Sequence, residues 1–376
     1  MMIRIKSLII LSALSLWSIQ VLGFYSFPES HASTQSYPFI ASTRGSFDLA
    51  DGTNIQQENL PSALNILNND NCPGELTIYV HGVWASEQEA EEQTERVFLS
   101  LLNTDYDIPV IGFSWDSNTA KNPTGWNLAK VIANQNGQNL ANFILEFKNQ
   151  CPNDDLRIIA HSLGSKVVLS AIQSLYEIGI TNADNIVKSV HLLGAAVDDE
   201  QVSLDKLQEC VNINDPPLPC SGEAIESVVS NFYNFYDSED NMLAFEEVLF
   251  DATPWNWFDD NFLSVTYPSP YLMTETDNPL GAYGKQSEIN TPENYQDYNV
   301  TAYIGNEPDS DKVNGCDLEV NLRNYGWLID YYYCTITKTG DNHFGYMGYR
   351  SETNPQTIED TGAIELVAEQ WRNEIN

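Results

Sequence analysis

Basic residues are scarce in this chain. It has 17 lysines and arginines against 53 aspartates and glutamates, which gives a formal net charge of −36 at pH 7. No basic cluster compensates for this excess. Such a charge repels phosphate backbones and anionic lipid headgroups. We therefore expect no nucleic-acid partner.

Signals for cofactors are also missing. The sequence contains no phosphate-binding loop, no dinucleotide fingerprint and no CxxC pair, so it predicts no cofactor and no metal or redox site. It does contain an even number of cysteines, namely Cys72, Cys151, Cys210, Cys220, Cys316 and Cys334. An even count behind an export signal predicts disulfide bonds.

Long apolar runs are confined to the N-terminus. Two basic residues precede an apolar run at positions 7–23, which is the pattern of a signal peptide. Small residues give candidate cleavage sites after Gly23 or Ala32, and an uncleaved membrane anchor is the alternative. We expect residues 1–32 to be this signal peptide or anchor and residues 33–376 to form one domain. The protein is then secreted or extracytoplasmic.

The rest of the chain alternates short apolar runs with amphipathic stretches from residue 74 onward. The apolar runs predict strands at 76–80, 109–115, 156–160, 187–193 and 228–236. Helical spacing predicts helices over 87–102 and around three apolar faces, which are Leu140/Phe143/Ile144/Phe147, Val168/Ala171/Ile172/Leu175 and Ile364/Val367/Ala368/Trp371. This alternation is typical of βαβ units. It predicts an α/β fold with a mainly parallel central sheet flanked by helices.

One segment breaks this pattern. Residues 244–300 are rich in aromatic residues, proline, aspartate and asparagine. A loop of this length in a compact domain is usually functional or carries structure of its own. We expect an aromatic-rich insertion or cap here.

A short motif suggests the chemistry. Ala160-His161-Ser162-Leu163-Gly164 follows an expected strand and precedes an expected helix. This is the context of a nucleophile elbow, in which the serine occupies a strained turn and small residues flank it. The pattern resembles the α/β-hydrolase family, with alanine in the first position where glycine is usual. The resemblance covers roughly residue 74 to the C-terminus, apart from the aromatic segment.

The resemblance implies the order nucleophile, acid, histidine along the chain. Of the five histidines, only His343 follows the later strands and their acids, so it is the expected general base. The acid is expected just beyond strand 228–236, where Asp240 is preferred and Asp237 is the alternative. Second-tier candidates are Asp198 and Asp199.

Family likeness also suggests the donors that stabilise an oxyanion. One is the amide of Leu163, directly after the nucleophile. The other is expected in the His81-Gly82 turn after strand 76–80, from the amide of Val83 or alternatively of Trp84. In the family's sheet order the strand before this turn neighbours the strand of the nucleophile.

The same sheet order predicts one disulfide. Cys72 and Cys151 each precede one of these two neighbouring strands, so we expect them to be joined. Local pairing then suggests Cys210 with Cys220 and Cys316 with Cys334.

Three functions fit these residues. The resemblance implies a serine hydrolase that cleaves carboxylic esters of small-molecule or lipid substrates, with a membrane tether if the N-terminal segment is retained. An acyltransferase or a peptidase would use the same triad. The alternative from another class is a binding or cell-surface module that keeps the fold without turnover.

Overall fold

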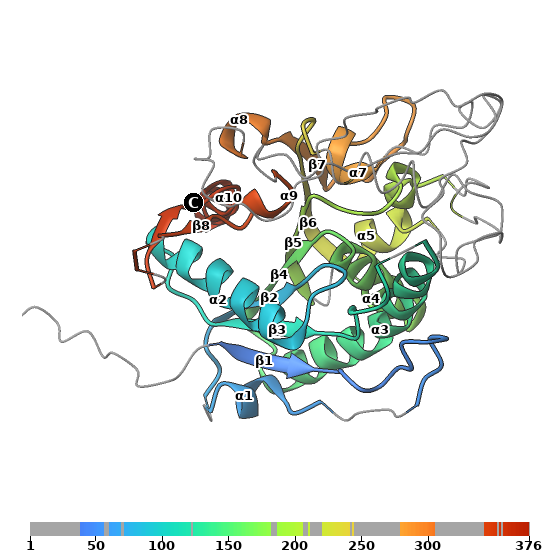
Figure 1. The fold of residues 1–376 in the computed structure, drawn as a ribbon, viewed down its shortest axis with the longest axis horizontal. Helices are drawn as coiled ribbons and strands as arrows, with labels where there is room; N and C mark the ends of the chain where they lie inside the picture. The colour runs from blue at the N-terminus through green and yellow to red at the C-terminus, as the bar shows by residue number, and fades with distance from the viewer. Residues whose placement is uncertain are drawn as a thin grey trace, which may run out of the picture. The chain divides into compact units, whose positions relative to one another are not determined.

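Seven parallel strands form the central sheet of the protein (Figure 1). The computed structural model describes residues 38–55, 60–68, 71–121, 123–181, 186–205, 210, 220–240, 243, 279–304, 342–351, 353–354 and 356–375. The sheet order is β1-β3-β2-β4-β5-β6-β7. The strands are β1 (Phe39–Ser42), β2 (Glu75–Val80), β3 (Val110–Ser114), β4 (Asp155–His161), β5 (Val187–Leu193), β6 (Val229–Tyr236) and β7 (Tyr295–Asn299).

Helices cover both faces of the sheet. On one face α3 (Pro123–Gln150) packs on α4 (Gly164–Glu177), and α4 packs on α5 (Gly222–Val228). On the other face α2 (Glu87–Asn103) packs on α10 (Ile364–Ile375). Because both faces are covered, central strands such as β4 are buried along nearly their whole length.

Shorter elements complete the described chain. They are the helices α1 (Ala63–Ile66), α7 (Leu280–Tyr283), α8 (Thr301–Ile304) and α9 (Asn342–Gly345), the 3-10 helix η2 (Asp199–Val202), and the strands β8 (Tyr349–Arg350) and β9 (Ile358–Asp360). The last two strands pair in an antiparallel fashion as a separate small sheet.

The predicted α/β fold is confirmed. Each of the five expected strands is present within a residue or two of its predicted bounds, and the four expected helices are α2, α3, α4 and α10. Two strands of the central sheet were not predicted, and neither were β8 and β9 of the small sheet. The two in the central sheet are β1 at one edge and β7 at the other.

The last part of the expected insertion belongs to the sheet instead. Residues 279–300 contain α7 and β7, and β7 pairs in register with β6 (Phe232↔Tyr295). This part of the segment is therefore the edge of the sheet. Residues 244–278 lie outside the described residues, so a cap there stays a prediction, as do the expected signal or anchor at 1–32 and the domain start at residue 33.

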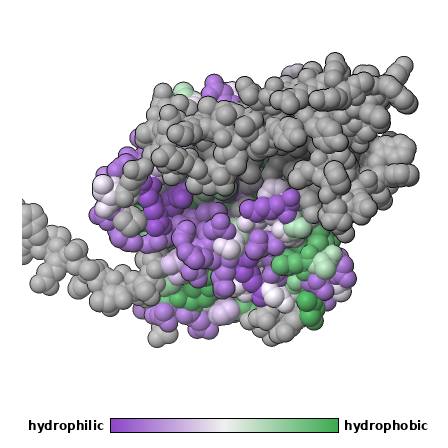
Figure 2. All heavy atoms as spheres, viewed as in Figure 1, coloured by the Kyte–Doolittle hydropathy of each residue, from purple (hydrophilic) through white to green (hydrophobic). Residues whose placement is uncertain are grey.

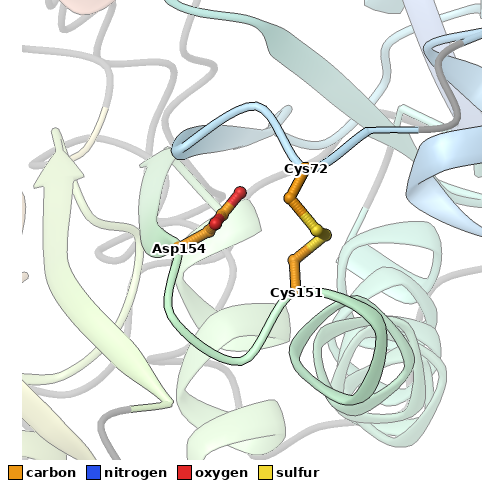
Figure 3. A group of neighbouring side chains, drawn as sticks. All are labelled: Cys72, Cys151 and Asp154. Carbon is orange, nitrogen blue, oxygen red and sulfur yellow. A yellow bond between two sulfur atoms is a disulfide. The ribbon is translucent and has the colours of Figure 1, made fainter.

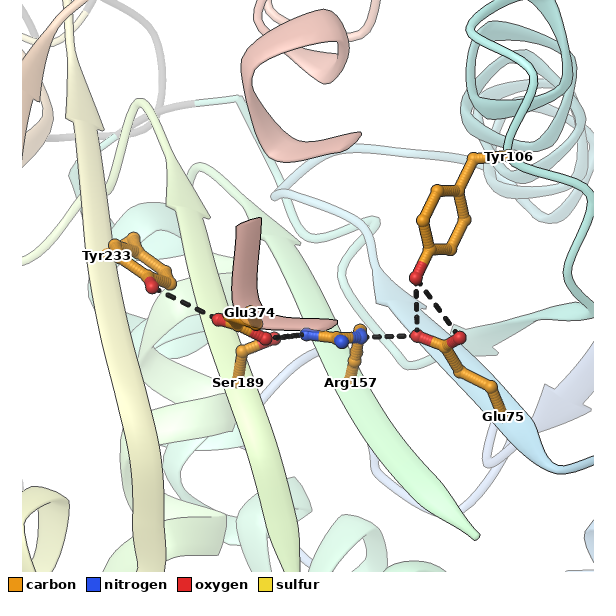
Figure 4. A network of polar contacts seen from close by, with 6 residues as sticks. All are labelled: Glu75, Tyr106, Arg157, Ser189, Tyr233 and Glu374. Atoms are coloured by element: carbon orange, nitrogen blue, oxygen red, sulfur yellow. Dashed lines mark hydrogen bonds and ion pairs between the residues drawn. The ribbon is translucent and has the colours of Figure 1, made fainter. Parts of the chain in front are cut away.

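A buried ion network ties the C-terminal helix to the sheet (Figure 4). The Arg157 side chain on β4 is fully buried and contacts the carboxylates of Glu75 on β2 and Glu374 on α10. Each carboxylate also accepts a tyrosine hydroxyl, from Tyr106 at 3.0 Å and from Tyr233 at 3.1 Å. Burying a charged group is costly unless it is paired and hydrogen-bonded, and most of the charged atoms here have such partners. The network therefore fixes the position of α10 on the sheet.

Two disulfides are present among the described residues. Cys72 is joined to Cys151, with 5.5 Å between their Cα atoms, and Cys210 to Cys220, with 5.2 Å. Both predicted pairs are confirmed, whereas Cys316 and Cys334 lie outside the described residues. Disulfides are typical of proteins that fold in an extracytoplasmic compartment.

The first disulfide clamps the starts of two neighbouring strands (Figure 3). Beside it, the Asp154 carboxylate accepts the Gly74 amide at 2.7 Å. Although Asp154 lies close to both sulfur atoms, sulfurs joined to each other are not thiolate ligands. The group therefore fixes β2 against β4 and is no metal site.

On the face seen in Figure 2, hydrophilic residues cover most of the described surface, and hydrophobic residues gather in small areas. The large hydrophobic side chains exposed in the described part are Leu49, Ile55, Leu102, Ile178, Tyr283 and Tyr303. Within that part, no helix has the length and apolar character needed to cross a bilayer.

Candidate active site

Ser162 occupies a strained turn between β4 and α4. Its backbone φ is 53°, a left-handed conformation that few residues other than glycine adopt. Hydrogen bonds from the Ser162 amide to the Leu193 carbonyl (3.0 Å) and from the Ala196 amide to the Ser162 carbonyl (3.2 Å) hold the turn. Strain of this kind persists only where the surroundings enforce it, and it is concentrated at functional sites.

Two glycines make room for this turn. A Cβ atom at Gly164 would lie 2.5 Å from the Val80 carbonyl oxygen, and one at Gly82 would lie 2.8 Å from the Ser162 Cβ. Neither position can therefore hold a larger residue. The close approach of Gly82 also places the turn after β2 directly against the serine.

Asp240 and His343 form a buried pair, although 103 residues separate them. The Asp240 Oδ2 atom lies 2.7 Å from His343 Nδ1, and both side chains are almost fully buried. A carboxylate can only accept, so Nδ1 carries the proton and Nε2 is left with a lone pair. In this tautomer His343 is ready to take up a proton.

The second oxygen of Asp240 is also held. The Leu243 amide donates to Oδ1 at 3.2 Å. The Tyr346 hydroxyl lies 3.5 Å from Oδ2, but it has a closer acceptor in the Gly281 carbonyl at 3.1 Å. The carboxylate is thus fixed in one orientation toward His343.

The other candidate acids are engaged elsewhere. Asp237 accepts the Glu239 amide at 2.9 Å and caps its own turn, and burial raises its pKa. Asp199 accepts the Gln286 amide at 2.7 Å, and burial raises its pKa as well. The backbone of Asp198 pairs with Pro279. Of the four candidates, Asp240 is the one whose carboxylate contacts the histidine.

His81 shapes the turn after β2. Its Nε2 accepts the Trp115 amide at 3.1 Å, and its Nδ1 donates to the Gly82 carbonyl at 2.8 Å. Burial, aided by the charge of Arg44, lowers its pKa to about 3. His81 is therefore a neutral structural residue.

The backbone amides near the nucleophile differ in whether they already donate a hydrogen bond. The Trp84 amide donates to the Ser117 carbonyl at 2.9 Å. The amides of Val83 and Leu163 have no hydrogen-bond partner within the described ranges. Of the two donors considered for this loop, Val83 is the one that remains free to bind an oxyanion.

The contacts of two residues in this region were not predicted. Arg44, just after β1, donates from Nη2 to the Ala85 carbonyl (2.9 Å) and from Nε to the Ser114 hydroxyl (2.6 Å), which braces the chain after the turn. His161 lies 2.7 Å from the His343 carbonyl. Arg44 lies in no sequence motif. His161, in contrast, directly precedes the nucleophile in the motif, which indicates a place in the site.

Comparison with known families matches residues 54–252 to a model described as an α/β hydrolase of unknown function (DUF900). The match spans more than half of the chain. The protein belongs to this α/β-hydrolase family. A comparison with curated proteins found no match.

Comparison of this α/β hydrolase with solved structures gives matches of low sequence identity and low TM-score. The catalytic core domain of acetyl xylan esterase from Trichoderma reesei is 16% identical, with 35% of this chain and 68% of that chain covered and a TM-score of 0.26. A Trichoderma reesei cutinase in complex with a phosphonate inhibitor is 20% identical (36% and 59% covered, TM-score 0.25). Phospholipase PlaB from Legionella pneumophila is 13% identical (45% and 40% covered, TM-score 0.27). This hydrolase thus covers less than two thirds of the length of the last two proteins.

Proposed function

We propose that this α/β hydrolase cleaves carboxylic esters through an acyl-enzyme intermediate, with Ser162 as nucleophile, His343 as general base and Asp240 as the supporting acid. The observation that carries the proposal is the buried 2.7 Å contact between His343 Nδ1 and Asp240 Oδ2. It is supported by the strained turn that presents Ser162 between β4 and α4.

The first half of the reaction forms the acyl-enzyme. His343 Nε2 takes the proton of the Ser162 hydroxyl as its oxygen attacks the carbonyl carbon, and Asp240 stabilises the resulting imidazolium. The carbonyl oxygen becomes an oxyanion. Collapse of this intermediate breaks the bond to the leaving alcohol, which receives the proton from His343. Water then repeats the sequence to release the acid and regenerate Ser162.

Two free amides and one helix would stabilise the oxyanion. The amides are those of Val83 and Leu163, and each such donor contributes about 100-fold to 1000-fold in rate. The N-terminus of α4, which begins at Gly164 and runs for 14 residues, adds the positive end of its dipole. Arg44 and His81 hold the loop that carries Val83.

The finer features belong to the same proposal. The N-terminal signal pattern and the two disulfides support an exported protein, which stays tethered to a membrane if the segment is not cleaved. We take the substrates to be small-molecule or lipid esters. The net charge of −36 argues against nucleic acid.

Hydrolysis of p-nitrophenyl esters from acetate to palmitate tests this function. We expect turnover by the wild type and a loss of at least about 1000-fold in Ser162→Ala, since the nucleophile is removed. The chain length with the highest kcat/KM then separates an esterase from a lipase. Turnover that survives in Ser162→Ala would rule out the proposed nucleophile.

A further inference from the structure

The side chain of His161 joins the nucleophile turn to the loop of the base. Its Nε2 atom lies 2.7 Å from the backbone carbonyl oxygen of His343, and the two imidazole rings lie 4.7 Å apart between centroids. His161 is the last residue of β4 and directly precedes Ser162. One hydrogen bond therefore spans 182 residues of sequence and connects the immediate neighbour of the nucleophile to the base itself.

The protonation state of His161 follows from its partners. A carbonyl oxygen only accepts, so Nε2 carries the proton. Burial, then the charge of protonated His343, lowers the pKa of His161 well below its usual value of 6.5. The ring is therefore neutral. Its Nδ1 atom has no hydrogen-bond partner among the described residues and lies against Gly82. His161 thus has a single N–H, and that N–H is committed to His343.

We propose that His161 is a positioning residue that holds the backbone of His343 at a fixed place relative to Ser162. This inference rests on the proposed function. The base lies in α9, which has only four residues and cannot be rigid by its own hydrogen bonds. Because a displacement of about 1 Å between reacting groups can cost about 100-fold in rate, an anchor one residue from the nucleophile has a direct effect on catalysis.

A neutral anchor also suits the reaction. His343 becomes positively charged when it takes the serine proton. A second protonated histidine in van der Waals contact with the His343 ring would repel this positive charge. The burial that keeps His161 neutral removes this repulsion, so the residue can hold the base without raising the energy of its imidazolium form.

Three substitutions separate positioning from packing. His161→Leu keeps most of the volume and removes the N–H, whereas His161→Gln keeps an N–H at nearly the place of Nε2. His161→Asn keeps an amide but is one bond too short to reach the His343 carbonyl. The matched control is His191→Leu, because His191 on β5 is also fully buried, and its ring stacks on Phe235 and lies tilted against Tyr233.

The assay is steady-state hydrolysis of p-nitrophenyl acetate from pH 5 to 9, with Tm measured for every variant. We expect His161→Leu and His161→Asn to lose about 10-fold to 100-fold in kcat with little change in KM. In both, the acid limb of the kcat/KM profile should move to lower pH, because a loosened His343 is less well supported by Asp240. His161→Gln should recover kcat to within about fivefold of the wild type, and His191→Leu should lower Tm alone.

Other results would overturn the inference. If folded His161→Leu keeps the wild-type kcat and pH profile, the hydrogen bond does not position the base. If His161→Gln is as slow as His161→Asn, the residue matters for its shape and not for its N–H. Either result leaves the proposed function intact provided Ser162→Ala is inactive, whereas an active Ser162→Ala would remove both proposals together.

Discussion

Replacing Asp240 by asparagine should inactivate the general base His343, although a side chain of nearly the same size still contacts it. The Leu243 amide donates to Asp240 Oδ1 at 3.2 Å, so the amide oxygen of an asparagine would take that position. Its NH2 group would then face His343 Nδ1, where the carboxylate Oδ2 lies 2.7 Å away in the wild type. Since an NH2 group donates, His343 would have to accept at Nδ1 and carry its proton on Nε2.

That tautomer cannot take a proton from Ser162. A histidine in the wrong tautomer costs about 10,000-fold in kcat, which corresponds to about 5.5 kcal/mol of activation free energy. We therefore expect Asp240→Asn to lose about 1000-fold to 10,000-fold in the hydrolysis of p-nitrophenyl acetate, with KM nearly unchanged.

Asp237→Asn is the matched control. It changes a buried aspartate three residues away, and the asparagine oxygen can still accept the Glu239 amide that Asp237 accepts now. We expect its kcat to stay within about threefold of the wild type. A kcat for Asp240→Asn within tenfold of the wild type, or an equal loss in both variants, would refute the reasoning about the acid.

Three further predictions concern stability and are checked by chemical denaturation. Arg157→Met removes the fully buried cation that two partly buried carboxylates share, so it should lower the unfolding free energy by about 3 kcal/mol; an unchanged unfolding free energy would contradict this. Replacing both Cys72 and Cys151 by serine removes a cross-link over 79 residues and should cost about 4 kcal/mol, against no change if the bond does not form. Burial lowers the pKa of His191 well below 6.5, so the unfolded state binds more protons in acid and the wild type loses stability as pH falls. The stability advantage of the wild type over His191→Leu should therefore shrink as the pH falls below 6.5, and an advantage that does not change with pH would contradict this.

The central strands could be predicted because burial on both faces requires continuous apolar runs. β4 and β5 are such runs, and the sequence 156–160 leads directly into the Ser162 turn. The edge strand β7 could not be found this way. Its sequence, YQDYN, is only half buried and lies in an aromatic stretch, so no run or alternation marks it.

The residues of the candidate site also differ in whether the sequence predicts them. Ser162 sits in a local motif, and His343 and Asp240 follow from the order of the chain. The contacts of Arg44 and His161 depend on segments 41 and 182 residues away that only the folded sheet brings together. No local pattern encodes such partners, because the register of distant strands determines them.

The most direct test of the account is the site of covalent modification. The wild-type protein is treated with a fluorescent fluorophosphonate, digested, and mapped by mass spectrometry, beside Ser162→Ala and His343→Ala. We predict one adduct, on Ser162, that is absent from Ser162→Ala and forms at least about 100-fold more slowly in His343→Ala. A folded wild type that takes up no label, or an adduct on another residue, would contradict the assignment of Ser162 as an activated nucleophile.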